Sequence, residues 1–177
     1  MMIMKSDEAE KAAVLQAANL ILAAIRTAPK SRGIDNIVAA VLSGSEKDEL
    51  SAEMKAIGEK NGNNTFLRDA KGILDSSAVI LLGSRFKPIG LKLCGLCGFP
   101  DCASLEKNNG ICLFNPTDLG IALGSAVSTA AALKIDNRIM YTAGFAAVRK
   151  KMLGEEVKLA YGIPLSVTGK NIFFDRP

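Results

Sequence analysis

Stretches with helical periodicity alternate with short, unbroken apolar runs along this chain, and this alternation limits the fold more than any other feature. Between positions 14 and 25 the large apolar residues recur every three or four positions, which predicts a helix with one buried face. The runs IVAAVL at 37–42 and AVILL at 78–82 contain no polar residue and predict buried strands. The alternation places the chain in the α+β or α/β class, and its 177 residues suit a single domain, residues 1–177.

Helix caps and chain breakers predict where these elements begin and end. Ser6 or Asp7 caps the first helix, and Pro29 ends it because proline disfavours helical geometry at the preceding residue. Ser45 and Asp48 resemble a capping box that opens a helix, which the sequence NGNN closes. The other predicted elements are a helix at 65–74, a long small-residue helix capped by Asn115–Asp118 and running to Leu133, a short strand at 138–142 (RIMYT), a helix at 145–152, a final strand within 156–167 and a tail at 169–177.

Charge and hydropathy argue against two kinds of partner. The net charge is +4, but Lys and Arg are interleaved with Asp and Glu, and the densest basic group, residues 149–151, is typical of a solvated helix face. Nucleic-acid binding requires a basic stripe with stacking aromatic residues, and this chain has few aromatics. The longest uncharged run, 119–133, is shorter than the roughly 20 apolar residues of a membrane helix. We therefore expect a cytoplasmic protein that binds neither nucleic acid nor a membrane.

All four cysteines lie in one short segment, and the chain contains no histidine. Their spacing is C-x2-C-x4-C-x9-C, at Cys94, Cys97, Cys102 and Cys112. A cytoplasmic protein keeps its thiols reduced, so a disulfide framework is not expected. The absence of histidine excludes Ser-His-Asp and Cys-His catalysis as well as histidine-ligated metals. The segment 92–114 is therefore predicted to be a metal-binding loop within the domain.

Four thiolates can bind a 4Fe–4S cluster, because each sulfur then ligates one iron corner. Gly95 and Gly98 each follow a cysteine, and glycine lets the backbone wrap closely and direct N–H groups at the sulfurs. Apolar residues that could cover such a cluster are Phe99, Pro100, Leu113 and Phe114.

Two other interpretations of the cysteines stay open. A structural zinc site with four thiolate ligands needs the same residues, although common zinc ribbons pair two C-x2-C knuckles and this loop has one. The cysteines could also be merely buried or redox-active thiols, although their concentration in one loop argues against chance. Spacing and glycine placement favour the iron–sulfur cluster over zinc.

The run CGLCGFPDC at 94–102, followed by Cys112, resembles the cluster motif of iron–sulfur electron-transfer proteins, C-G-x-C-G-x-x-x-C with a fourth cysteine downstream. Taken with AAIRTAPKSRGIDNI and GIPLSVTGKNIFFDR, nearly the whole chain resembles the uncharacterised ferredoxin-domain family of anaerobic bacteria and archaea. This resemblance implies a cluster on the four cysteines and implies no particular reaction.

A second, weaker resemblance is to the nitroreductase fold. It rests on A-P-K at 28–30 after a helix, D-x-G-x-A at 118–122 with A-A-x-L at 130–133, and G-x-P at 162–164 in the final strand. Nitroreductase-like proteins are obligate homodimers with FMN at the dimer interface. The resemblance therefore implies a homodimer, a central sheet flanked by helices, and a four-cysteine loop inserted into that scaffold.

This sequence differs from the nitroreductases at the residues that bind FMN in those proteins. Nitroreductases open with an R-R-S-x-R stretch that binds the FMN phosphate, which this chain lacks, and Lys30 replaces the serine of their A-P-S element. The cations left to bind a flavin are Arg26, Lys30 and Arg32, with Lys170 and Arg176 near the phosphate. The alternative is that each is a solvent-facing charge at the end of an element, just as Lys158 is expected on the exposed side of the final strand.

Three functions remain open at this stage. The first is an oxidoreductase in which a 4Fe–4S cluster exchanges electrons with a flavin and serves a redox partner protein or a small-molecule acceptor. The second is a non-enzymatic electron carrier or sensor that uses the cluster alone. The third is a domain in which zinc or a cluster pins a long loop and supplies folding energy instead of redox chemistry.

Overall fold

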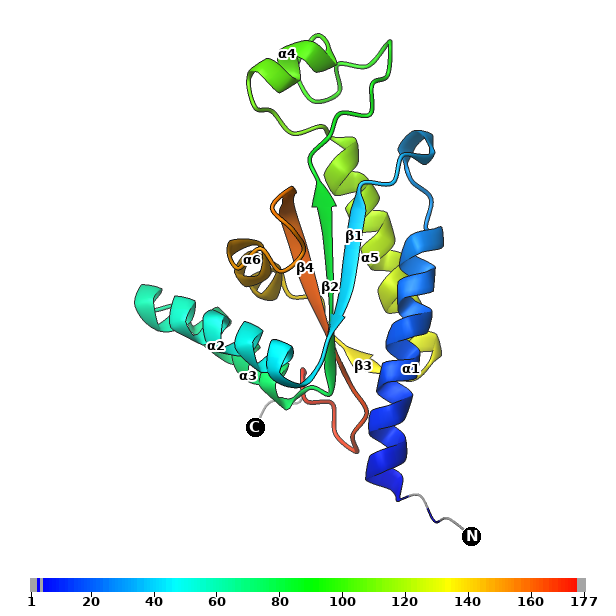
Figure 1. The fold of residues 1–177 in the computed structure, drawn as a ribbon, viewed down its shortest axis with the longest axis vertical. Helices are drawn as coiled ribbons and strands as arrows, with labels where there is room; N and C mark the ends of the chain where they lie inside the picture. The colour runs from blue at the N-terminus through cyan, green and yellow to red at the C-terminus, as the bar shows by residue number, and fades with distance from the viewer. Residues whose placement is uncertain (1–2, 4, 175–177) are drawn as a thin grey trace.

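Four antiparallel strands form one sheet in the part of the chain that the structure, a computed structural model, describes: residue 3 and residues 5–174. β1 (Ile37–Leu42) pairs with β2 (Ala78–Arg85), and β2 pairs with β4 (Val157–Ser166). The two-residue β3 (Asp136–Asn137) pairs with the end of β4. The order across the sheet is therefore β1-β2-β4-β3 (Figure 1).

Helices cover both faces of this sheet (Figure 1). α1 (Ser6–Thr27) and α5 (Phe114–Ala132) pack against one face. The other face carries α2 (Gly44–Asn61), α3 (Asn64–Asp75) and α6 (Tyr141–Arg149). A short 3-10 turn, η1 (Ser31–Gly33), links α1 to β1, and α4 (Cys102–Lys107) stands apart beyond the upper end of β2. An antiparallel sheet between two helical layers places the protein in the α+β class, as the sequence predicts.

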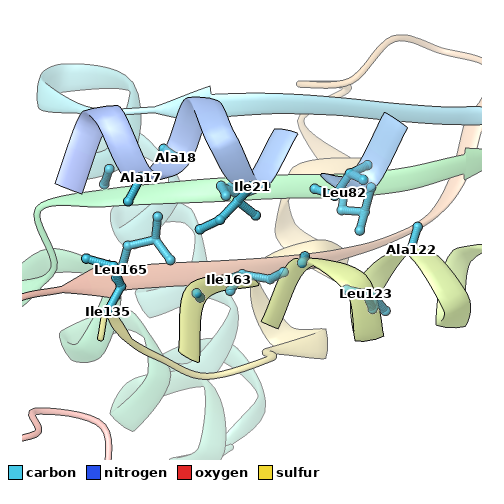
Figure 2. Packing of buried hydrophobic residues seen from close by; sticks show 14 of the residues in the cluster. Ala17, Ala18, Ile21, Leu82, Ala122, Leu123, Ile135, Ile163 and Leu165 are labelled. Carbon is cyan, nitrogen blue, oxygen red and sulfur yellow. The ribbon is translucent and has the colours of Figure 1, made fainter. Parts of the chain in front are cut away.

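Side chains of β2 alternate between two hydrophobic cores, which explains why its sequence is apolar throughout. Ile80 and Leu82 join the core beneath α1 and α5, whereas Val79 and Leu81 join the core beneath α2, α3 and α6. Figure 2 shows the first core, where small residues let both helices approach the sheet closely. Its labelled members are Ala17, Ala18 and Ile21 of α1, Leu82 of β2, Ala122 and Leu123 of α5, Ile135, and Ile163 and Leu165 of β4.

The strand predicted at 37–42 and the helix predicted at 65–74 are confirmed, but several predicted boundaries are wrong. Helix α1 begins at Ser6 without a side-chain cap, so Ser6 and Asp7 lie inside it. Helix α2 begins at Gly44, with Ser43 in the N-cap position, so the Ser45 hydroxyl bonds to Glu46 instead of capping the helix. In each case a helix extends past the polar residue that was expected to cap it.

The largest correction concerns residues 138–142, which do not form a strand. Only Met140 pairs with the sheet, through backbone hydrogen bonds of 2.8 and 2.9 Å that join it to Gly162, and Tyr141 already begins α6. Helix α6 begins directly after this bridge, so the helix expected at 145–152 lies at 141–149.

Helix α5 corresponds to the uncharged run, and it begins at Phe114 rather than after Asp118. Pro116 therefore lies in its first turn, where a missing N–H costs nothing because it has no helical partner. Across the described residues, no helix combines the length and the apolar character needed to cross a bilayer.

Helix α6 lies directly on the backbone of β4, and this contact requires glycine. A Cβ atom on Gly144 would lie 1.7 Å from the carbonyl oxygen of Ala160 and 2.6 Å from the amide nitrogen of Tyr161. From the strand side, a Cβ atom on Gly162 would lie 2.5 Å from the Cβ of Ala143. Because most of these neighbours are backbone atoms that cannot rotate away, the two glycines set the distance between α6 and the sheet.

The variant Gly144→Ala tests this contact. We expect its free energy of unfolding to fall by about 2 kcal/mol or more, since the added methyl group must push α6 off β4. Urea denaturation measures the change. The matched control is Gly169→Ala, because a Cβ there meets no atom within 4 Å; its stability should stay within about 0.5 kcal/mol of the parent protein. Equal stability of the two variants would contradict the packing described here.

Candidate metal centre

The four cysteines lie in the connection between β2 and α5, residues 86–113, which projects beyond one end of the sheet (Figure 1). The short helix α4 within it was not predicted from the sequence. Asp101 caps this helix by accepting a 2.7 Å hydrogen bond from the Ser104 N–H. Hydrogen bonds from the backbone and hydroxyl of Ser104 hold the pKa of Asp101 below its usual value. The cap fixes Cys102 as the first residue of the helix.

All four thiols are free and line one small cavity of about 30 Å³. Cys112 is buried, Cys97 and Cys102 are half-buried, and Cys94 is exposed. Ile89 and Leu105 form a small core with Cys112, apart from the two cores of the sheet. The residues expected to cover the site, namely Phe99, Pro100, Leu113 and Phe114, all line the same cavity.

Glycines shape the backbone around the first two cysteines as the sequence predicts. Gly95 and Gly98 have φ angles of 82° and 85°, a region that residues with a side chain rarely adopt. The Gly98 N–H donates a 3.0 Å hydrogen bond to the carbonyl of Gly95, which closes a tight turn around Cys97. Cys94, Gly95 and Cys97 all line the cavity.

The donor set fits a thiolate-ligated metal centre, although the loop is not closed around one. All four cysteines line one cavity, and the chain offers no imidazole to compete with them. Within residue 3 and residues 5–174, no group of three or more Asp, Glu or Cys side chains forms an arrangement that could hold a metal ion. Binding therefore requires the exposed part of the loop to close on the buried Cys112.

Side chains of the scaffold hold the first residues of this loop. The Asn115 Nδ2 donates a 3.0 Å hydrogen bond to the carbonyl of Lys87, which joins the two ends of the loop. The Arg32 guanidinium donates 2.9 Å hydrogen bonds to the carbonyls of Ile89 and Gly90. We call Asn115 and Arg32 the stem clamp. Sequence reasoning missed the role of Asn115, since a hydrogen bond between residues 28 apart leaves no local pattern.

A buried carboxylate attaches the same end of α5 to η1. Asp118 accepts hydrogen bonds of 3.1 and 3.2 Å from the Ser31 N–H and one of 2.8 Å from the Ser31 hydroxyl. Asp118 was expected to cap α5, but it lies inside the helix and bonds across to the turn that carries Arg32. The bond therefore positions the stem clamp.

The predicted flavin cations near the end of α1 already have protein partners. The side chain of Lys30 is only 6% exposed, and its ammonium donates a 2.8 Å hydrogen bond to the Ile25 carbonyl at the end of α1. Arg26 forms an ion pair with Asp35, and Lys30 lies 3.9 Å from the same carboxylate. Partial burial raises the pKa of Asp35, but hydrogen bonds from Arg26 and the Ile37 N–H, with the charge of Lys30, outweigh it and hold the pKa below its usual value.

The remaining predicted flavin cations do not gather with these. Arg32 belongs to the stem clamp. Lys170 is exposed in the segment that follows β4, and Figure 1 shows this segment at the end of the sheet opposite α4. Arg176 lies outside the described residues. One chain thus brings Arg26 and Lys30 together beside Asp35, uses Arg32 in the stem clamp and leaves Lys170 apart from them.

The fold is that of the nitroreductases. It matches the nitroreductase CinD from Lactococcus lactis, solved in complex with nicotinic acid, with a TM-score of 0.63 at 14% identity over 95% of this chain and 81% of that one. It also matches the FMN-dependent nitroreductase NfnB from Mycobacterium smegmatis, solved in complex with NADPH, with a TM-score of 0.58 at 13% identity over 88% of this chain and 78% of that one. At such low identity the likeness shows the fold alone.

Sequence comparison identifies the family. Residues 108–176 match the family described as uncharacterised proteins containing a ferredoxin domain (DUF2148), a span that includes Cys112 but not the other three cysteines. An uncharacterised protein from Archaeoglobus fulgidus is 38% identical over 99% of this chain and 98% of its own length. The chain belongs to this family of uncharacterised ferredoxin-domain proteins.

The stem clamp can be tested with the variant Asn115→Ala. Loss of the Asn115 bond leaves the Lys87 carbonyl with only the longer 3.5 Å hydrogen bond from the Asn36 Nδ2, and it should cost about 1 kcal/mol. We expect amide hydrogen exchange to accelerate in residues 87–113 while exchange in β2 and β4 stays unchanged. Asn137→Ala is the matched control, because Asn137 Nδ2 donates a similar 3.0 Å bond to Ile135 away from the loop. Unchanged exchange in the loop would refute the clamp.

Proposed function

We propose that this protein is an iron–sulfur redox protein that binds one 4Fe–4S cluster through Cys94, Cys97, Cys102 and Cys112. The observation that carries the proposal is that four free cysteines line one cavity, in a chain whose family is described by a ferredoxin domain. When bound, such a cluster accepts and releases single electrons.

The residues of the loop favour a cluster over the alternative, a structural zinc ion. Buried Cys112 and the apolar side chains Phe99, Leu105 and Phe114 give the inner wall of the cavity low polarity. Exclusion of solvent and N–H groups near the sulfurs are the means by which a protein adjusts a cluster potential. A structural zinc ion undergoes no redox change, so an apolar wall has no potential to adjust there.

Metal analysis of anaerobically purified protein tests the proposal. We expect about four iron atoms and as many sulfide ions per chain, since four thiolates complete one 4Fe–4S cluster. The variant Cys112→Ser should lose both, whereas Leu93→Ser should keep both because the Leu93 side chain is 97% exposed in the same loop. Zinc without iron in the parent protein would contradict the proposal and support the structural alternative.

The scaffold also supports a homodimer with a bound flavin. The exposed residues of α5 are all small or uncharged, so this face can be covered without burying a charge; they are Thr117, Gly120, Ile121, Gly124, Ser128, Ala131 and Ala132. We propose that two copies of the chain meet along their α5 helices and that FMN binds between the copies. Arg26, Lys30 and Arg32 of each chain would lie near one end of the two α5 helices. The cluster and the flavin together would connect a redox partner protein to a small-molecule acceptor.

Sedimentation velocity of protein supplied with FMN tests this second part. The parent protein should sediment as a dimer that retains the flavin. Gly124→Glu should dissociate the dimer and release the flavin, because the substitution places a charge between the two α5 helices. Gly169→Glu, in the exposed tail, should leave the dimer intact. A folded monomer without flavin would exclude this part, and the iron–sulfur proposal would then stand as an electron carrier alone.

A further inference from the structure

A cavity of about 560 Å³ lies between α6 and the first half of β4. We call it the α6–β4 pocket and define it by Tyr141, Phe145, Arg149, Lys158 and Tyr161. Its volume falls within the roughly 300–1,000 Å³ of sites that bind small molecules. The pocket lies where α6 meets β4, and none of the cations proposed for the flavin lines it.

Two aromatic rings stand partly exposed in this pocket and are held in place from behind. Tyr141 and Phe145 are four residues apart on one face of α6 and are 53% and 54% exposed. Phe66, which is buried in α3, contacts both rings edge to face, with centroid distances of 6.0 and 5.8 Å. Rings ordered in this way can contact a flat ligand without a further loss of side-chain freedom.

The cation Lys158 enters the pocket from a bulge in β4. Ser84 of β2 pairs with Leu159 and Arg85 pairs with Val157, which leaves Lys158 as the extra residue. A bulge of this kind redirects a side chain out of the regular alternation. The Lys158 ammonium donates a 2.9 Å hydrogen bond to the Glu155 carbonyl, and it forms no ion pair among the described residues.

The pocket lies near the cysteine site, because residues between the two line neighbouring cavities. Lys158 also lines a neighbouring cavity of about 370 Å³, whose other walls include Phe86 and Cys112. Cys112 and Leu105 in turn line the cavity of the four thiols. Lys158 and Cys112 thus connect the aromatic pocket to the candidate metal centre.

We infer that the α6–β4 pocket binds a planar aromatic molecule that carries an anionic group. The ring contacts Tyr141 and Phe145, and the anion pairs with Lys158, aided by Arg149, whose guanidinium lies 3.1 Å from Glu53 and remains largely exposed. An aliphatic anion would lack the ring contacts. The inference extends the proposed redox function by naming the class of small molecule beside the metal centre, and its test does not require the metal.

Calorimetric titration with anthraquinone-2-sulfonate tests the assignment, because this probe is a planar aromatic anion that does not alkylate thiols. We expect saturable binding, with cyclohexanesulfonate binding at least tenfold more weakly. Lys158→Gln should weaken probe binding about tenfold, and Phe145→Leu about fivefold. The control Lys11→Gln removes an exposed cation from α1, on the other face of the sheet, and should not change the affinity.

Hydrogen exchange locates the bound probe independently of the affinities. Residues 141–149 and 157–161 should gain protection when the probe is added, both in the metal-loaded protein and in the Cys97→Ser variant. No measurable binding, an affinity that Lys158→Gln leaves unchanged, or protection confined to other segments would overturn the inference. Because the Cys97→Ser arm contains no complete metal site, failure of the iron–sulfur proposal and failure of this one give different results.

Discussion

The candidate metal centre depends on how the cysteine loop is attached to the sheet. The loop has a small core of its own, built around Ile89, Leu105 and Cys112, which is too little to fix a long connection. The stem clamp supplies the attachment, because Asn115 and Arg32 hold the carbonyls of residues 87–90. Asp118 extends the clamp by bonding α5 to the turn that carries Arg32. The buried Cys112 is thereby fixed next to α5, while Cys94 stays exposed and free to close on a metal.

The second constraint is the close contact between α6 and β4. Gly144 and Gly162 allow the helix to rest on the strand backbone, and this contact sets the position of Tyr141 and Phe145 along the sheet. The bulge at Lys158 lies two residues before Ala160, at the end of β4 that pairs with the end of β2, where the cysteine loop begins. Two unrelated features of β4 therefore bring an aromatic surface, a cation and a thiol site to one end of the molecule.

Much of the fold could be predicted from local pattern, and the exceptions share a physical cause. The apolar runs of β1 and β2 are visible because every residue faces one of two cores. The cysteine loop is visible because its ligands are contiguous in sequence. By contrast, Asn115, Asp118 and Lys30 act through hydrogen bonds to carbonyls or to residues far along the chain, which no spacing reveals. Residues 138–142 have strand composition but turn into a helix after one bridge, because tertiary packing of α6 outweighs their β propensity.

The central claim is that four thiols of one loop bind a single iron–sulfur cluster. X-ray absorption spectroscopy of the anaerobically purified protein tests it most directly, since it identifies the metal and its neighbours together. The account predicts an iron edge with a shell of sulfur neighbours and a second shell of iron at the short distance found only within a cluster. A zinc edge with four sulfur neighbours and no metal in the second shell would contradict it.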